Sequence, residues 1–220
     1  MGTVALTGAN RGIGLELARQ LAARGDTVIA AVRSASDELA SLNVEVHEGV
    51  DVSDDKSVAQ FASALSGRQL DILINNAGIL TRENLDDLDW DRIRTQFEIN
   101  TLGPLRVTAA LLPCLSDGSK VAIVSSRVGS LADNSSGNNY GYRISKTAVN
   151  MVGVNLSHDL KDRGIAVVLL HPGYVRTGLT DMSGNVDPDE AARGLIERID
   201  ETTLEHTGTF WHADGTELPW

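Results

Sequence analysis

The segment from Thr3 to Gly25 constrains the fold of this chain more than any other. Thr3–Thr7 is a short apolar run typical of a buried strand, and Gly8–Gly14 follows at once with the spacing G-x-x-x-G-x-G. A helical apolar pattern then continues until Gly25. When a strand, a glycine-rich turn and a helix are joined in this order, the helix N–H groups and dipole face a bound pyrophosphate. This segment therefore predicts a dinucleotide site.

The rest of the chain alternates strands with helices. We expect further strands at residues 27–32, 43–47, 70–74, 120–125, 165–170 and 207–211. Such alternation implies a parallel sheet that helices cover on both faces. We therefore expect a single NAD(P)-binding domain over residues 1–220, folded as a Rossmann-like three-layer α/β/α sandwich with a mostly parallel sheet of about seven strands.

Two of the expected helices carry specific predictions. Residues 58–65 should form a helix that Ser53 and the acids after it cap. Residues 85–112 should form one long helix, in which Pro104 has no N–H to offer the Asn100 carbonyl. We expect a kink there and, on the free carbonyl, a water that could pass protons to a lysine. A kinked helix without a chemical role is the alternative.

Composition argues against several classes of function. The 19 basic and 30 acidic residues give a net charge of −11, which disfavours binding to nucleic acid or to anionic membrane surfaces. Cys114 is the only cysteine, and the five histidines show no metal-binding spacing. Residues 1–6 do not resemble a signal peptide, and no apolar run approaches the ~20 residues that span a bilayer. We expect a cytoplasmic protein that binds no metal.

Tyr142 and Lys146 form a candidate catalytic pair. Side chains four residues apart on a helix lie on one face, one turn apart. A phenol ordinarily has a pKa near ~10, and a fixed ammonium beside it should move that pKa towards neutrality. The pair could then act as a general acid and base on an alcohol or carbonyl, and a plain surface helix is the alternative. The serine-rich turn Ser125–Gly129 could supply a hydroxyl that holds the substrate oxygen.

Arg11 and Arg33 indicate which dinucleotide binds. An acidic residue at the end of the second strand would bind the ribose 2′-hydroxyl of NAD, but Arg33 stands there and Arg11 lies in the glycine turn. Two guanidinium groups suit a 2′-phosphate. The sequence thus predicts a preference for NADP(H), with NAD(H) as a second usable cofactor. Arginines that are solvated surface groups are the alternative.

Polar turns follow other strands at the same expected edge. Asp51 could accept a hydrogen bond from the adenine amino group or serve as a turn carboxylate. Asn75–Gly78 should fix the loop after the fourth strand and support the cofactor. After the sixth strand, His171-Pro172-Gly173 leads to Thr177, whose hydroxyl could bind a carboxamide. Together with the serine turn, these segments should converge on one crevice.

With these motifs in place, the chain resembles the short-chain dehydrogenase/reductase family. The matching residues, in the family's order, are Thr7–Gly14, Asp51, Asn75–Gly78, Asn100, Ser125–Ser126, Tyr142 with Lys146, and Pro172–Gly173 with Thr177. Within the family, the segments Ser125–Ser130, Tyr140–Arg143 and Gly215–Trp220 are similar to the C-factor and sniffer-type carbonyl reductases.

The resemblance implies a catalytic tetrad of Asn100, Ser126, Tyr142 and Lys146. Ser126 would orient the carbonyl, Tyr142 would donate the proton, and Lys146 would lower the pKa of Tyr142 and bind the nicotinamide ribose. Asn100 would hold a relay water through its main chain, and Ser125 remains an alternative to Ser126. The implied cofactor-binding residues are Gly8, Asn10, Arg11, Gly12, Ile13, Gly14, Arg33, Asp51, Val52, Asn75, Ala77, Gly78, Tyr142, Lys146, Pro172, Gly173, Val175 and Thr177.

The expected function is that of an NADP(H)-dependent oxidoreductase that interconverts a ketone or aldehyde and an alcohol by hydride transfer. A dinucleotide-binding signalling or regulatory protein of C-factor type, acting through a partner, is the alternative. We expect a short lid over the substrate around residues 176–190. The wide apolar arc of the helix at residues 141–163, together with the helix at 85–112, predicts a homodimer or homotetramer.

Overall fold

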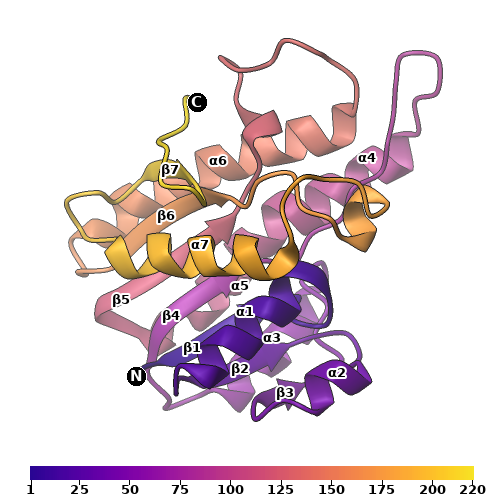
Figure 1. Ribbon diagram of the computed structural model, residues 1–220. Coiled ribbons are helices and arrows are strands. Elements are labelled where there is room, and N and C mark those ends of the chain that lie inside the picture. The colour runs from indigo at the N-terminus through magenta and orange to yellow at the C-terminus, as the bar shows by residue number, and fades with distance from the viewer.

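A parallel sheet of seven strands forms the centre of the protein in the computed structural model, which describes residues 1–220 (Figure 1). The strands are β1 Thr3–Thr7, β2 Thr27–Ala31, β3 Glu45–His47, β4 Leu70–Asn75, β5 Leu115–Val124, β6 Ala166–His171 and β7 Thr209–His212. Their order across the sheet is β3-β2-β1-β4-β5-β6-β7, and every neighbouring pair is parallel. The expected Rossmann-like α/β fold is confirmed.

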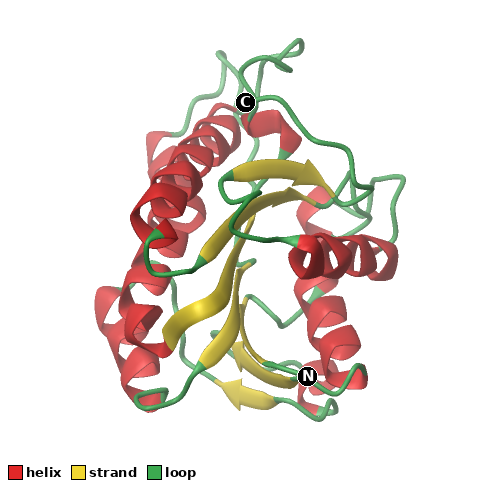
Figure 2. Cartoon of the chain, turned by 90° about the vertical axis from the view of Figure 1, so that its left-hand side faces the viewer, coloured by secondary structure: helices red, strands yellow, loops and turns green.

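Helices cover both faces of the sheet, which gives the three layers visible in Figure 2. The helices are α1 Gly12–Ala23, α2 Asp37–Ala40, α3 Asp55–Ala64, α4 Trp90–Phe97, α5 Gly103–Leu111, α6 Tyr140–Lys161 and α7 Pro188–Glu201. One buried apolar cluster joins the sheet to α3, α5 and α6, and a second joins its other face to α1, α2 and α7. Along β1, Ala5 belongs to the first cluster and Val4 and Leu6 to the second, as the alternation of a strand requires.

The expected single helix over residues 85–112 is wrong in two respects. Helix α4 begins only at Trp90, because the Asp89 carboxylate accepts hydrogen bonds from the N–H groups of Asp91 and Arg92, each at 3.0 Å. A π-helical turn at Glu98–Leu102 then separates α4 from α5. Such a turn is one of the few ways in which a helix accommodates a break in its regular hydrogen bonding, and Pro104 imposes that break.

The cap of α3 agrees with the expectation in part, and α2 is a further difference. Asp54, one of the acids after Ser53, caps α3, because its carboxylate accepts from the Lys56 N–H at 2.8 Å. The Ser53 hydroxyl takes no part in this cap and donates to Asp51. Helix α2 was not expected at all, since four residues are too few to show a periodic pattern. Ser36 caps this helix.

The strand order creates a crevice at the carboxyl ends of β1 and β4. The chain leaves β1 towards β2 and β3 on one side and returns to β4 on the other, so the loops that follow β1 and β4 diverge. The glycine turn, the loop that starts at Asn75 and the pair Ser125–Ser126 all follow strands at this edge. None of the helices combines the length and the apolar character that crossing a membrane requires.

Candidate active site

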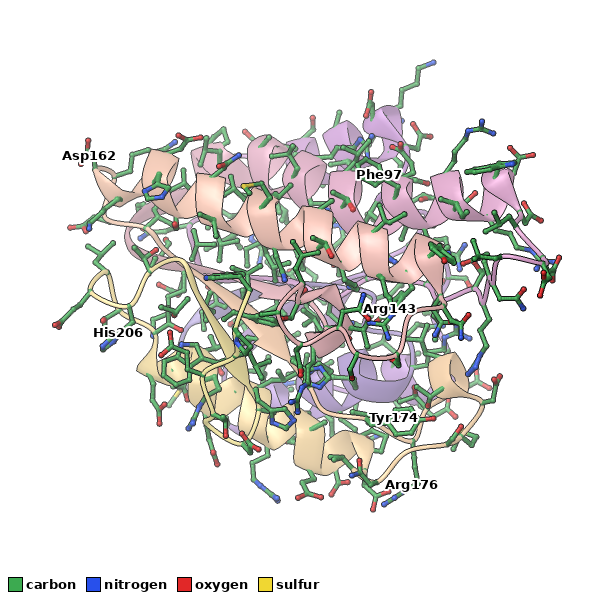
Figure 3. All side chains as sticks on the ribbon, turned by 90° about the horizontal axis from the view of Figure 1, so that it is seen from above. Phe97, Arg143, Asp162, Tyr174, Arg176 and His206 are labelled. Atoms are coloured by element: carbon green, nitrogen blue, oxygen red, sulfur yellow. The ribbon has the colours of Figure 1, made fainter.

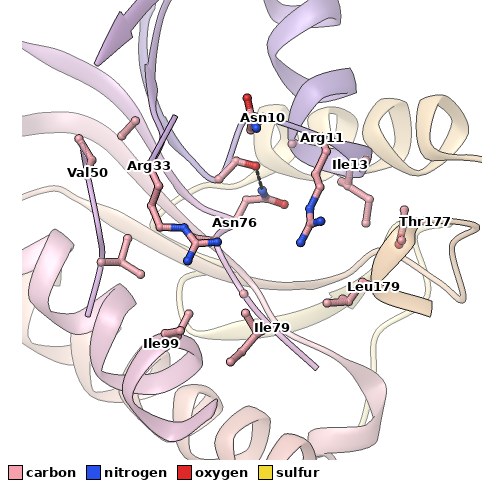
Figure 4. Close-up of a pocket in the computed structure, with 18 of the residues that line it drawn as sticks. Asn10, Arg11, Ile13, Arg33, Val50, Asn76, Ile79, Ile99, Thr177 and Leu179 are labelled. Carbon is pink, nitrogen blue, oxygen red and sulfur yellow. Dashed lines mark hydrogen bonds between the residues drawn. The ribbon is translucent and has the colours of Figure 1, made fainter. Parts of the chain in front are cut away.

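A cleft of about 350 Å³ opens at the carboxyl ends of β1, β2 and β4. Its walls come from the glycine turn, the end of β2, the turn around Asp51, the loop after β4 and residues 177–179. Figure 4 shows the guanidinium groups of Arg11 and Arg33 reaching into this space from two sides. Segments that are far apart in the sequence thus meet where the crevice was expected. We call this space the first cleft.

At Gly8 and Gly14 the turn leaves no room for a side chain. A Cβ atom at Gly14 would lie 2.1 Å from the Gly8 carbonyl oxygen, and one at Gly8 would lie 2.8 Å from Ala77 Cα. Gly8 and Gly12 also have φ angles of +71° and +54°, which residues with side chains rarely adopt. Asn76 braces the turn, since its Nδ2 donates to the Gly8 carbonyl at 3.1 Å (dashed line in Figure 4). This bare backbone at the start of α1 fits a pyrophosphate group.

Arg11 and Arg33 are exposed at the rim of the first cleft, and no salt bridge engages either guanidinium group. Most of the other arginines pair with carboxylates, as Arg24 does with Asp26. Two guanidinium groups without carboxylate partners, facing one space, are well suited to a phosphate group.

Asp51 is a turn carboxylate at the edge of the first cleft. Its Oδ1 accepts hydrogen bonds from the Ser53 N–H at 2.9 Å and from the Ser53 hydroxyl at 2.6 Å, so it is a turn residue. It also lines the first cleft. The hydrogen bond from the Ser53 hydroxyl lowers the pKa of Asp51, and the charges of Arg33 and Arg106 lower it further. The side chain therefore stays an acceptor at neutral pH.

A larger cleft of about 1050 Å³ adjoins the first one. The two clefts share Ile13, Thr177 and Leu179 as walls, so molecules bound in them would lie side by side. Ser126 and Tyr142 both line this second cleft, and the Ser126 hydroxyl is near enough to lower the pKa of the Tyr142 phenol. The candidate catalytic hydroxyls therefore face the larger space.

Lys146 is buried between Tyr142 and the first cleft. Its Nζ lies 5.7 Å from the centroid of the Tyr142 ring and donates to the Val124 carbonyl at 2.8 Å. A Cβ built on Gly78, which lines the first cleft, would be 3.8 Å from the same Nζ. The helical spacing thus brings the ammonium close to the phenol ring, as expected, and also to the wall of the first cleft.

The expected lowering of the Tyr142 pKa is not found in this structure. Burial raises the pKa of Tyr142 to about 12, and the nearby Ser126 hydroxyl opposes this rise only in part. Burial also lowers the pKa of Lys146 to about 8. Desolvation prevails because the ammonium lies over the ring and is bonded to a main-chain carbonyl.

Asn100 is fully buried in the π-helical turn, where its side chain bridges three elements. Its Nδ2 donates to the Ile79 carbonyl at 2.9 Å and to the Ser145 hydroxyl at 3.0 Å, while its Oδ1 accepts from the Ile79 N–H at 2.9 Å. Asn100 therefore ties the loop after β4 to α6, the helix that carries Tyr142 and Lys146.

The structure gives the two candidate serines, Ser125 and Ser126, different surroundings. Ser125 is buried, and its hydroxyl donates to Asn150 Oδ1 on α6 at 2.5 Å. Ser126 instead lines the second cleft with Tyr142, and its hydroxyl oxygen accepts from the Val128 N–H at 3.4 Å. The Ser125 hydroxyl thus holds β5 against α6, whereas the Ser126 side chain faces the second cleft.

Some of the predicted cofactor-binding residues do not line the first cleft. Asn75 is buried and donates from Nδ2 to the Thr108 hydroxyl at 3.1 Å. Pro172, Gly173 and Val175 line the second cleft instead, as Tyr142 does. The predicted residues that do line the first cleft are Gly8, Asn10, Arg11, Gly12, Ile13, Gly14, Arg33, Asp51, Val52, Ala77, Gly78 and Thr177.

Several polar residues of the clefts were not among the predicted site residues, although two of them, Asn76 and His171, belong to motifs that were expected at this crevice. Ser34 and Asn76 line the first cleft, and their positions beside Arg33 and inside the Asn75–Gly78 motif were usable signals. His171 and His212 line the second cleft, with ring centroids 4.9 Å apart. Burial lowers the pKa of His171 to about 3, so the His171 ring is neutral at neutral pH. No local pattern pairs these two histidines, because they lie on different strands.

This fold, with a glycine turn at one cleft and a Ser–Tyr–Lys group beside it, defines a dinucleotide-dependent oxidoreductase. The model of the short chain dehydrogenase family matches residues 2–190, and the chain belongs to that family. The resemblance seen in the motifs is therefore confirmed.

Similar proteins include two curated relatives. The chain is 50% identical to 1-hydroxy-2-glutathionyl-2-methyl-3-butene dehydrogenase from Rhodococcus sp. (strain AD45), with 100% of both chains covered. It is 44% identical to C-signal from Myxococcus xanthus, over 73% of this chain and 98% of that protein.

Solved structures of carbonyl reductases are also similar. The NADPH-bound carbonyl reductase from chicken fatty liver has a TM-score of 0.92 and 29% identity, with 100% of this chain and 99% of that chain covered. Carbonyl reductase Sniffer of D. melanogaster has a TM-score of 0.90 and 27% identity, with 100% of both chains covered.

Proposed function

We propose that this protein is an NADP(H)-dependent oxidoreductase that interconverts a ketone or aldehyde and the corresponding alcohol. The observation that carries the proposal is the position of Tyr142. Its side chain lies with Ser126 in a cleft that shares three lining residues, Ile13, Thr177 and Leu179, with the cleft of the glycine turn. A proton donor for an alkoxide thus stands beside a dinucleotide-sized site. The decisive experiment, replacement of Tyr142 by phenylalanine, is described in the Discussion.

The residues of the first cleft fit NADP(H). The turn Gly8–Gly14 at the start of α1 offers N–H groups to a pyrophosphate, and Arg11 with Arg33 suits the 2′-phosphate. Asp51 suits the adenine amino group. Bound there, NADPH would supply the hydride, while the protein orients it and excludes water. Two similar structures, the chicken carbonyl reductase and a short-chain dehydrogenase/reductase from Burkholderia multivorans, contain NADPH or NADP, which supports this choice.

Ser126 and Tyr142 would act together on the substrate oxygen. In reduction, both hydroxyls donate hydrogen bonds to the carbonyl oxygen, and Tyr142 passes its proton to the alkoxide as it forms. In oxidation, the Tyr142 phenolate takes that proton from the alcohol. The ammonium of Lys146 stabilises the phenolate. A relay water on the Asn100 main chain would then return the proton to the pair.

The second cleft favours a polar substrate larger than a simple ketone. Its volume of about 1050 Å³ is large for a small-molecule site, and its walls include Arg127, Arg143 and the two histidines. The relative with 50% identity is named for an alcohol that carries a glutathionyl group. We therefore propose glutathionyl-substituted alcohols with NADP⁺ as the first substrates to test, followed by a panel of aldehydes and ketones with NADPH.

A second candidate function is a dinucleotide-binding regulatory protein that acts through a partner. The 44% identity to C-signal favours it. Tight NADPH binding without turnover of any carbonyl or alcohol in the panel would support this candidate over the enzyme. The intact group of Ser126, Tyr142 and Lys146 supports the enzyme, because binding alone needs no proton donor.

The pH dependence of carbonyl reduction should reflect Lys146. Its ammonium is the form present below its pKa of about 8, whereas Tyr142, with a pKa of about 12, keeps its proton well above that pH. We therefore expect kcat/KM for reduction to fall as the pH rises through about 8. In Lys146→Arg, the residual activity should lose this fall, because arginine stays charged. A wild-type profile that is flat across this region would contradict the assignment.

We also propose that α4, α5 and α6 form a contact between copies of the chain. Phe97, Leu105 and Met151 expose 36%, 39% and 62% of their surfaces there, and Figure 3 shows α4 and α6 side by side with Phe97 on the outside. Met151→Asp should lower the mass measured by analytical ultracentrifugation, because a charge would be buried in the contact. Leu204→Asp, an exposed leucine in the loop after α7, is the control. A monomeric wild type would refute the contact.

A further inference from the structure

A buried carboxylate outside both clefts contacts the start of the helix that carries Tyr142. Glu83 is 2% exposed and lies in the loop between β4 and α4. It forms no salt bridge, unlike most buried acids. Burying a carboxylate in this way is costly unless hydrogen bonds satisfy it, so the donors around Glu83 indicate its role.

Three donors satisfy this carboxylate. Gln96 Nε2 donates to Oε1 at 3.1 Å, the Thr81 hydroxyl donates to the same oxygen, and the Gly141 N–H donates to Oε2 at 3.3 Å. The main-chain carbonyl of Glu83 accepts from the Asn139 N–H at 2.8 Å. Glu83 is therefore bonded to the start of α6 through both its side chain and its main chain.

Helix α6 has no cap from its own sequence. Asn139 precedes it with a left-handed φ of +49° and makes no side-chain capping bond, and the first turn of α6 contains no acidic residue. The first N–H groups of a helix need acceptors and favour a nearby negative charge. Glu83, which lies 58 residues before Gly141, supplies both.

Close packing leaves little freedom at this contact. A Cβ at Gly141 would lie 2.2 Å from Gln96 Nε2 and 3.1 Å from Ile93 Cα, so α4 and the start of α6 are in direct contact. Gln96 is itself fully buried, and its Oε1 accepts from the Thr81 N–H at 2.9 Å. Each polar side-chain atom of Glu83 and Gln96 thus has a hydrogen-bond partner.

We infer that Glu83 is a positioning residue for Tyr142: by holding the Gly141 N–H, it fixes where the Tyr142 hydroxyl stands relative to Ser126. Tyr142 follows Gly141 directly, so a displacement of the helix start is passed on to the phenol. A displacement of ~1 Å in a reacting group costs on the order of 100-fold in rate. The kinetic consequence rests on the function proposed above, whereas the structural one does not.

The test compares Glu83→Ala with two conservative variants. In Glu83→Ala the Gly141 N–H loses its acceptor, so we expect kcat for carbonyl reduction to fall about 10- to 100-fold. The NADPH dissociation constant, measured by fluorescence, should not change, because the first cleft is untouched. Amide hydrogen exchange at residues 139–142 should accelerate more than elsewhere in the chain. Glu83→Gln keeps one oxygen that can accept from the Gly141 N–H, but its NH₂ group would face the donors Gln96 and Thr81. Its kcat should therefore lie between those of the wild type and Glu83→Ala, whereas the shorter Glu83→Asp should not restore kcat.

Asp54→Ala is the matched control, because it removes the cap of α3 far from Tyr142. It should lower the melting temperature without changing kcat or exchange at residues 139–142. The inference is overturned if Glu83→Ala lowers kcat no more than Asp54→Ala does, or if aspartate restores kcat and glutamine does not. An active Tyr142→Phe would refute the proposed function instead, and the exchange at residues 139–142 would still show whether Glu83 holds the helix start.

Discussion

Tyr142→Phe should abolish carbonyl reduction, with turnover at least about 100-fold below that of the wild type, while NADPH still binds. The substitution removes only the hydroxyl: the ring, its packing over the Lys146 ammonium and the walls of the first cleft remain. Ser126 alone can donate a hydrogen bond to the carbonyl oxygen, but an aliphatic hydroxyl is a much weaker acid than a phenol and is a poor proton donor to the alkoxide. The measurements are NADPH oxidation with a panel of reactive ketones and aldehydes, and NADPH binding by fluorescence.

Tyr140→Phe is the matched control for this experiment. Tyr140 is the first residue of α6, lines neither cleft and has Ile144 rather than a lysine four residues later. It should keep wild-type kcat. Should Tyr142→Phe retain wild-type turnover across the whole panel, the catalytic assignment would be wrong, and only a dinucleotide-binding protein would remain.

Arg33→Asp should raise KM for NADPH by about 100-fold and leave KM for NADH nearly unchanged. Charge-assisted hydrogen bonds contribute on the order of 1.5–3 kcal/mol, and the new carboxylate would also repel the 2′-phosphate. NADH has a 2′-hydroxyl at that place, which an aspartate at the end of β2 can bind. Steady-state kinetics with both cofactors and one substrate would measure the change.

Arg94→Asp controls for the change in net charge that Arg33→Asp introduces. Arg94 lies on α4, exposes 75% of its side chain and lines neither cleft. It should leave both KM values unchanged. Equal increases in KM for NADPH and NADH in Arg33→Asp would show that Arg33 does not bind the 2′-phosphate.

The strands were predictable because buried parallel strands are nearly continuous apolar runs. The run at 165–170, for example, differs from β6, Ala166–His171, by one residue at each end. The π-helical turn at Glu98–Leu102 was not predictable in this way. It is held by Asn100, whose partners Ile79 and Ser145 are distant in the sequence. Pro104 signals that the helix is disturbed but not which local structure results.

The geometry of the candidate site could also be predicted from the sequence only in part. The spacing of Tyr142 and Lys146 predicts that the two side chains are neighbours, but the direction of a pKa shift depends on depth of burial, which spacing does not contain. At the end of β4, adjacent amides face different ways: Asn75 meets Thr108 in the core, and Asn76 meets Gly8 at the first cleft. The motif predicts the loop, and only the packed sheet determines which amide reaches the crevice.

The two clefts draw on different halves of the chain. Apart from residues 177–179, the first cleft is lined by residues that precede position 100, and apart from Ile13, Leu80 and Arg82 the second is lined by residues from Ser125 onward. On the proposed function, substitutions in the later half should alter which alcohol or ketone is accepted and leave the nucleotide preference unchanged. Exchange of the segment after α5 between relatives should then transfer substrate selectivity as a unit.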